Sequence, residues 1–206
     1  MTEQRKLVTV LFADIVGSTG ITLGRDPEVV RASLRFTFDE LRPILEAHGA
    51  TVEKFIGDEV MAVFGVPVAH DDDADRAVRA AFALMRRLRE LNQMPRAIPL
   101  ELRIGINSGE TVAGSGEGRE FLVTGEPVIA AARLRGAAEP GEIVVGALTH
   151  SLTKEGVSFG PSRTFDAKGI GRLELWPTLG LRSDIPVAPR GVLPRFMQLL
   201  GSATRL

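Results

Sequence analysis

A short and nearly uninterrupted apolar run, residues 7–15, most constrains the fold of this chain. The run is rich in β-branched residues and carries a single charge, Asp14, next to its end. A run of this length and composition predicts a buried strand. It is followed by a Gly-containing turn, residues 16–19, of the kind that presents backbone N–H groups to an anion, although the lysine pattern of a Walker A loop is missing. The turn that follows the predicted strand should therefore begin next to the carboxylate of Asp14.

The next elements follow in a recognisable order. Residues from about 27 to 48 place apolar side chains at helical spacing, and a second helical stripe begins near the acidic residues 71–73. Between these helices, residues 51–55 and 59–64 predict two strands of a hairpin, and residues 100–106 predict another strand. The order β-α-β-β-α-β predicts an α+β fold with a ferredoxin-like core, in which the helices lie on one side of a mainly antiparallel sheet.

Additional elements are predicted behind this core: a glycine-rich ribbon at 112–123, an alanine-rich helix at 127–138 and strands at 142–145 and 172–176. After the last of these strands, prolines punctuate a segment that has no clear hydrophobic period. We therefore expect one domain over residues 1–178 and a Pro-containing linker or tail over residues 179–206.

Composition excludes several classes of protein. The net charge is −1, so nothing in the bulk charge favours nucleic acid or an acidic membrane as a partner. The chain contains no cysteine, which excludes disulfides, thiolate catalysis and cysteine-based zinc sites. No apolar run reaches transmembrane length, and the first residues lack the apolar core of a signal peptide. We expect a cytoplasmic domain whose own sequence makes no contact with a membrane.

Two carboxylates stand out, Asp14 at the end of the first strand and Asp58 at the tip of the hairpin. In a β-α-β-β order the first and third strands are neighbours, so the tip should bring Asp58 close to Asp14. Two such charges repel each other unless a cation lies between them. Mg²⁺ usually takes one or two carboxylates together with substrate phosphates. Taken singly, each aspartate is more often a cap or turn residue, but together they favour a metal site.

Four segments in a fixed order resemble the motifs of the class III adenylate/guanylate cyclase catalytic domain: residues 12–19, 53–65, 102–109 and 121–134. Residues 167–169 also resemble the late segment of that family that contacts phosphate. The resemblance covers about residues 6–177. It implies the α+β cyclase fold described above, with the extra C-terminal β and α elements.

The resemblance also assigns roles to individual positions. Asp14, Ile15 and Asp58 match the metal-binding positions, which implies two Mg²⁺ or Mn²⁺ ions per site. Lys54 matches the purine-selecting lysine, and a lysine suits adenine N1, an acceptor, better than guanine N1, which carries a hydrogen. Arg133 matches the arginine that stabilises charge on the α-phosphate, and with Asp14 and Asp58 it forms the catalytic set. The other matches are substrate contacts: Arg103, Lys168, Gly17, Ser18 and Thr19.

Two substrate-binding positions depart from the family pattern. Leu122 stands where an acceptor for the adenine amine is usual, and leucine cannot accept a hydrogen bond. Purine selection should then be looser or come from the backbone. Ile129 stands where an asparagine usually orients the ribose. Loss of one such group lowers a rate by roughly 10²–10³, by comparison with oxyanion donors.

The resemblance implies a homodimer with two equivalent sites at its interface. One subunit would supply Asp14, Asp58 and Arg103. The other subunit would supply Lys54, Arg133 and Lys168. The implied activity is that of an adenylate cyclase acting on ATP, with GTP the less favoured substrate. The alternative, motivated by Leu122 and Ile129, is a weakly active or inactive nucleotide-binding module that regulates a neighbouring domain. A diguanylate-type synthase is disfavoured, because its Gly-Gly-Asp/Glu-Glu-Phe hairpin is not found.

Overall fold

The computed structural model describes residues 4–16, 26–56, 58–95, 98–113 and 123–182. Eight strands form one sheet in the order β2-β3-β1-β4-β5-β8-β6, with β7 paired to β8. All pairs are antiparallel except β4 with β5. The strands are β1 (Gln4–Ile15), β2 (Thr51–Ile56), β3 (Glu59–Phe64), β4 (Leu102–Ala113), β5 (Ile143–Gly146), β6 (Val157–Phe159), β7 (Arg163–Ala167) and β8 (Gly171–Leu181). The predicted α+β class and mainly antiparallel sheet are confirmed.

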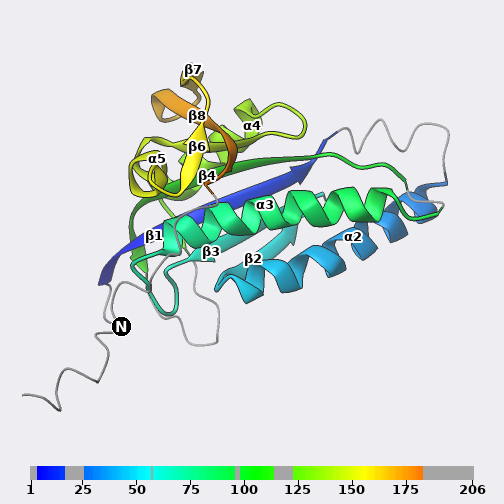
Figure 1. The fold of residues 1–206 in the computed structure, drawn as a ribbon. Coiled ribbons are helices and arrows are strands. Elements are labelled where there is room, and N and C mark those ends of the chain that lie inside the picture. Colours follow the sequence, from blue (N-terminus) through cyan, green and yellow to red (C-terminus); the bar gives the residue numbers. More distant parts are fainter. Residues whose placement is uncertain (1–3, 17–25, 57, 96–97, 114–122, 183–206) are drawn as a thin grey trace, which may run out of the picture.

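Four helices accompany this sheet in the described part of the chain: α2 (Pro27–Ala47), α3 (Asp73–Asn92), α4 (Glu126–Ala137) and α5 (Ala147–Thr153). Figure 1 shows α2 and α3 lying side by side along the sheet. As predicted from its acidic start, α3 begins with Asp73 and Asp75 in its first turn, at the positive end of the helix dipole. None of the described helices has the length and hydropathy needed to cross a bilayer.

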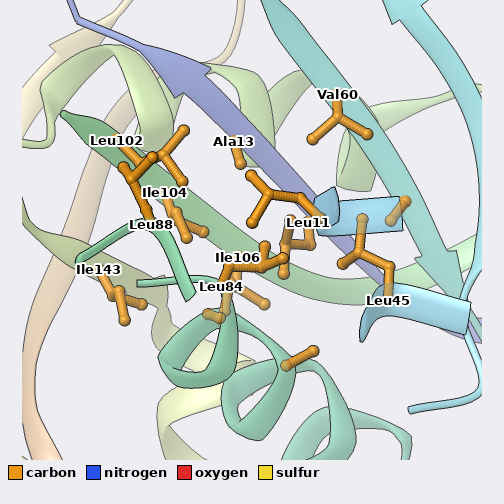
Figure 2. Packing of buried hydrophobic residues seen from close by; sticks show 14 of the residues in the cluster. Leu11, Ala13, Leu45, Val60, Leu84, Leu88, Leu102, Ile104, Ile106 and Ile143 are labelled. Carbon is orange, nitrogen blue, oxygen red and sulfur yellow. The ribbon is translucent and has the colours of Figure 1, made fainter. Parts of the chain in front are cut away.

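The main core lies between the sheet and the α2–α3 pair. Alternate residues of β1, namely Leu11, Ala13 and Ile15, belong to this core, because successive side chains of a strand point to opposite faces. They pack with Leu45 of α2 and Leu84 of α3 (Figure 2). These buried apolar side chains anchor β1 between β3 and β4, and this fixes the position of the residues at the end of β1.

The other face of β1 carries a second, smaller core that includes Val10 and Phe12. Ala131 of α4 packs into this cluster, so α4 covers the face opposite to α2 and α3. The expectation that the helices lie on one side therefore holds for the ferredoxin-like core alone. The sequence did not reveal the side taken by α4, because this alanine-rich helix has only a weak apolar stripe.

Differences from the predicted elements concentrate in the second half of the chain. Strand β4 is longer than predicted, and α5, β6 and β7 were not predicted at all. These three elements are short, so they span too few residues to display a hydrophobic period. Strand β8 continues to Leu181, past the predicted domain boundary at residue 178. The prediction of a linker concerns residues that lie almost entirely outside the described ranges.

Candidate active site

Three neighbouring strands place charged side chains at one level of the sheet. Asp14 near the end of β1 lies opposite Glu59 of β3 on one side and opposite Arg103 of β4 on the other. Asp58 precedes Glu59 at the hairpin tip, and its carbonyl oxygen accepts a hydrogen bond from the backbone N–H of Ile15 at 3.0 Å. The predicted approach of Asp14 and Asp58 is thus a consequence of β1 and β3 being neighbours.

The alternation of each strand decides which way these side chains point. Asp14 lies two residues after Phe12, on the face covered by α4, and it is 5% exposed. Glu59 precedes Met61 of the same cluster by two residues. The charged groups are therefore held beneath α4 rather than in the main core.

Helix α4 can lie close to this part of the sheet because residue 105 is glycine. A Cβ atom at Gly105 would be 2.2 Å from the backbone nitrogen of Arg135 and 2.6 Å from the carbonyl oxygen of Ala131. Such distances are far inside van der Waals contact, so no larger residue fits while α4 keeps this position. The close approach brings Arg135 over the ends of β1 and β3.

Two arginines pair with the buried carboxylate of Asp14. Arg103 directs its Nε and Nη2 atoms to Oδ2 of Asp14, each at 2.7 Å. Arg135 reaches the same oxygen with Nη1 at 3.3 Å and binds Oε2 of Glu59 with Nη2 at 2.7 Å. A buried carboxylate is strongly destabilised unless it is paired. The described part of the domain satisfies this requirement with arginines from β4 and α4.

Arg135 and Glu59 are members of the cluster that the sequence did not predict. Arg135 follows the motif residue Arg133 by two positions and looks like one more cation on a helix surface. Glu59 directly follows Asp58 and could have been suspected from the alternation of β3, which places it on the same face as Met61. No comparable local signal exists for Arg135, because its partners lie far away in the sequence.

The charged cluster changes the pKa of Glu59. Burial raises the pKa of Glu59 above its ordinary value, and the negative charges of Asp14 and Asp58 raise it further. The positive charge of Arg135 and its hydrogen bond act in the opposite direction without cancelling the effect of burial. Three carboxylates are thus close enough to influence one another at this end of the sheet.

This donor set suits a hard divalent cation. Carboxylate oxygens are the ligands that Mg²⁺ prefers, and both arginine contacts of Asp14 are made to Oδ2, which leaves Oδ1 outside them. Ile15 can add only its main-chain carbonyl, because its side chain is buried in the main core. Among the described residues, no group of three or more acidic, histidine or cysteine side chains forms a complete metal cage. A cation held here would complete its coordination with water molecules and, when a nucleotide is bound, with the phosphates.

The other predicted cations form a separate group. Arg133 of α4 donates from Nε to the carbonyl oxygen of Lys168 at 3.1 Å, and both residues are exposed. Two residues along a helix correspond to a rotation of about 200°, so Arg133 and Arg135 point to opposite sides of α4. The structure therefore brings Asp14, Asp58 and Arg103 together, brings Arg133 and Lys168 together, and keeps the two groups apart.

The remaining predicted residues are placed only in part. Ile129 lies on α4 and is 44% exposed, so its apolar side chain faces outward in a single chain. Lys54 belongs to β2, but the position of its side chain falls outside the described structure. The predictions for Gly17, Ser18, Thr19 and Leu122 also concern residues outside the described ranges. Their roles stay predictions.

Comparison with known proteins agrees with the fold and the motifs. Residues 1–178 match the family model described as the adenylate and guanylate cyclase catalytic domain. The adenylyl cyclase CyaB from P. aeruginosa superposes with a TM-score of 0.81 at 30% identity, over 90% of this chain and 100% of that one. The guanylyl cyclase Cya2 superposes with a TM-score of 0.82, also at 30% identity, over 90% and 98% of the two chains. The resemblance noted in the sequence is confirmed.

Two curated relatives are named as adenylate cyclases. Adenylate cyclase 1 of Rhizobium meliloti is 34% identical over 186 residues, which cover 86% of this chain and 28% of that protein. An adenylate cyclase of Mycobacterium tuberculosis is 32% identical over 193 residues, which cover 91% of this chain and 43% of that protein. The chain thus spans less than half the length of these relatives.

Proposed function

Because the chain belongs to the family of adenylate and guanylate cyclase catalytic domains, we propose that it converts ATP into 3′,5′-cyclic AMP and pyrophosphate. In this reaction the ribose 3′-oxygen forms a bond to the α-phosphorus, and the bond from that phosphorus to the pyrophosphate oxygen breaks. The observation that supports the proposal most is the convergence of Asp14, Asp58 and Arg103 at one end of the sheet. The reaction is intramolecular, so positioning and charge neutralisation supply most of the catalysis.

Asp14 and Asp58, with the main-chain carbonyl of Ile15, are the groups that would hold Mg²⁺ or Mn²⁺, two ions per site. Bound there, the ions would lower the pKa of the ribose 3′-hydroxyl and neutralise charge on the triphosphate. Arg103 already lies against Asp14 and would turn to the triphosphate as a bidentate donor. The turn residues Gly17, Ser18 and Thr19 would offer backbone N–H groups to the same phosphates.

The complete site requires a second copy of the chain. Arg133 would stabilise charge at the α-phosphate of the partner's nucleotide, and Lys168 would contact its triphosphate. Their position on the opposite side of α4 from Arg135 supports this arrangement, since they cannot face Asp14 of their own chain. A closed homodimer then contains two equivalent sites.

ATP is the proposed substrate because Lys54 can donate to adenine N1. The names of the curated relatives support this preference, whereas several of the similar solved structures are named guanylyl or guanylate cyclases. GTP is therefore the competing nucleotide to test alongside ATP. We further propose that the cyclase domain, predicted over residues 1–178, runs on to the end of β8 at Leu181, that the remaining residues up to 206 form a linker or tail, and that the domain works in the cytoplasm.

A second function is favoured by two positions that depart from the family pattern. Ile129 has no polar group where the family pattern has an asparagine that orients the ribose, and Leu122 cannot accept from the adenine amine. A domain with these two residues can still bind a nucleotide with its metal. It would then act as a nucleotide-dependent regulatory module with little or no turnover.

One set of assays separates the two functions. Purified protein is incubated with ATP or GTP and Mn²⁺, and cyclic nucleotide is measured by chromatography against an Asp14→Ala control. An adenylate cyclase produces cyclic AMP well above that control, and Ile129→Asn should raise the rate by about 10²–10³. Product at the level of the control, together with saturable nucleotide binding, would establish the regulatory module instead. An unchanged rate in Ile129→Asn would show that the asparagine position is not limiting here.

A further inference from the structure

Arg135 has contacts that the proposed reaction does not use. Its guanidinium joins α4 to two carboxylates at the end of the sheet, Asp14 at 3.3 Å and Glu59 at 2.7 Å. We propose that Arg135 is a built-in counter-ion that competes with the divalent cation for Asp14 and thereby sets the metal affinity of the site. This inference rests on the proposed function in one respect, namely that Asp14 is a metal ligand.

The competition follows from charge and burial. The side chain of Asp14 is 7% exposed, and its Oδ2 atom is shared by guanidinium groups of Arg103 and Arg135. A divalent cation bound to this carboxylate lies within a few ångströms of two positive charges. Repulsion between charges at such distances is strong in a site screened from water. The cation can bind tightly only when at least one arginine moves away from Asp14.

Arg135 is the arginine better placed to move. It contacts Asp14 through one nitrogen at 3.3 Å, whereas Arg103 makes two contacts of 2.7 Å. Arg135 also keeps a second anchor, because its Nη2 atom stays bound to Glu59 when Nη1 leaves Asp14. Arg103 has no second carboxylate among its contacts in the described structure. Arg135 can thus release Asp14 without leaving the site.

The present position of Arg135 is also incompletely satisfied. Its Nε–H donor is buried and has no hydrogen-bond partner among the described residues. A buried donor without an acceptor destabilises the arrangement that contains it. This lowers the free energy needed to move the guanidinium, and it makes the contact with Asp14 suited to exchange rather than to permanent structure.

The experiment measures metal binding directly, without turnover. Metal-stripped protein is titrated with Mn²⁺ in the absence of nucleotide, and free Mn²⁺ is followed by its electron paramagnetic resonance signal. Arg135→Gln removes the competing charge and should bind Mn²⁺ about tenfold more tightly than the wild type. Arg135→Lys keeps the charge and should stay within about threefold of the wild type.

Two further variants serve as controls. Arg163→Gln removes an arginine whose 2.6 Å ion pair with Glu142 lies outside the cluster, so Mn²⁺ affinity should not change. Asp14→Asn should abolish the tight binding. Equal affinities in Arg135→Gln and the wild type, with unchanged circular dichroism, would overturn the inference and leave the metal site standing. If neither the wild type nor Arg135→Gln shows Mn²⁺ binding that depends on Asp14, both the inference and the metal site of the proposed function are overturned.

A measurement on the unmodified protein covers the case in which Arg135→Gln does not fold. The side-chain N–H signal of Arg135 is assigned by nuclear magnetic resonance through its loss in Arg135→Lys. On titration with Mg²⁺ alone, this signal should shift with the same midpoint as metal binding. A signal that stays constant while Asp14-dependent binding saturates would show that Arg135 takes no part in the exchange.

Discussion

At the residue scale, the pairing of β1 with its two neighbouring strands determines which charged side chains meet in the candidate site. Asp14 lies opposite Glu59 and Arg103 on its two neighbouring strands, so three charged side chains share one level of the sheet. Such charges are rarely buried unless they are paired, and here Arg135 completes the pairing from the helix above. This environment changes the pKa of Glu59, because the effect of burial, which raises the pKa, exceeds the opposing effect of Arg135.

The raised pKa of Glu59 predicts a pH-dependent contribution to stability. Between the ordinary value of 4.5 and the raised value, the folded metal-free protein holds a proton that the unfolded chain has lost. The free energy of unfolding must therefore fall as the pH rises through this window and stay lower above it. Glu59→Gln removes this contribution, so its stability should decline less with pH than that of the wild type.

Urea denaturation of both proteins in a chelating buffer, from about pH 4 to about pH 7, checks this expectation. A constant difference in the free energy of unfolding between the two proteins reports the lost ion pair with Arg135. A difference in how steeply the free energy of unfolding changes with pH reports the raised pKa of Glu59. Parallel curves would contradict the role assigned to burial of Glu59.

At the scale of elements, the contact between α4 and β4 decides the geometry of the site. Gly105 permits the backbone of α4 to lie directly on the strand, at a distance that excludes any Cβ atom. The presence of most elements was predictable: β1 is an apolar run, α2 and α3 carry helical stripes, and β2 and β3 flank a hairpin tip. The packing distance between α4 and β4 was not predictable, because a single glycine in a strand has several possible meanings.

Gly105→Ala should separate α4 from the sheet and destabilise the domain by roughly 1–3 kcal/mol, the usual range for overpacking. Gly136→Ala is the matched control, because Gly136 lies in the same helix and a Cβ atom there would meet nothing within 4 Å. This control should be neutral or stabilising by about 0.5–1 kcal/mol. Thermal or urea unfolding measures both. Equal effects of the two substitutions would contradict the close contact.

On the scale of the whole molecule, two clusters of predicted site residues lie apart on one chain. Asp14 and its partners lie under α4, whereas Arg133 and Lys168 meet on the exposed side of the same helix. One copy of the chain cannot bring both clusters to one nucleotide without refolding. Two copies related by a two-fold axis can do so at two equivalent sites, which is the basis of the proposed homodimer.

Mixing two inactive variants tests this arrangement. Asp14→Ala and Arg133→Ala should each abolish cyclic AMP production when assayed alone. In a mixed dimer one site combines both changes, and the other has an intact Asp14 from one chain and an intact Arg133 from the other. Random mixing should restore about a quarter of the wild-type activity, since half the dimers are mixed and each has one working site. No recovery in an equimolar mixture that exchanges subunits would contradict a shared site.

The sequence by itself determined the family, the order of the main elements and the meeting of Asp14 with Asp58. These depend on local hydrophobic periods, on motif residues and on the neighbour relation of the first and third strands. Only the tertiary structure decided that α4 covers the second face of the sheet and that Arg135 and Glu59 join the site. Arg135 lies 121 residues from Asp14 in the chain, and their contact depends on the packing distance set at Gly105. Contacts of this kind follow from how whole elements pack, which local patterns do not encode.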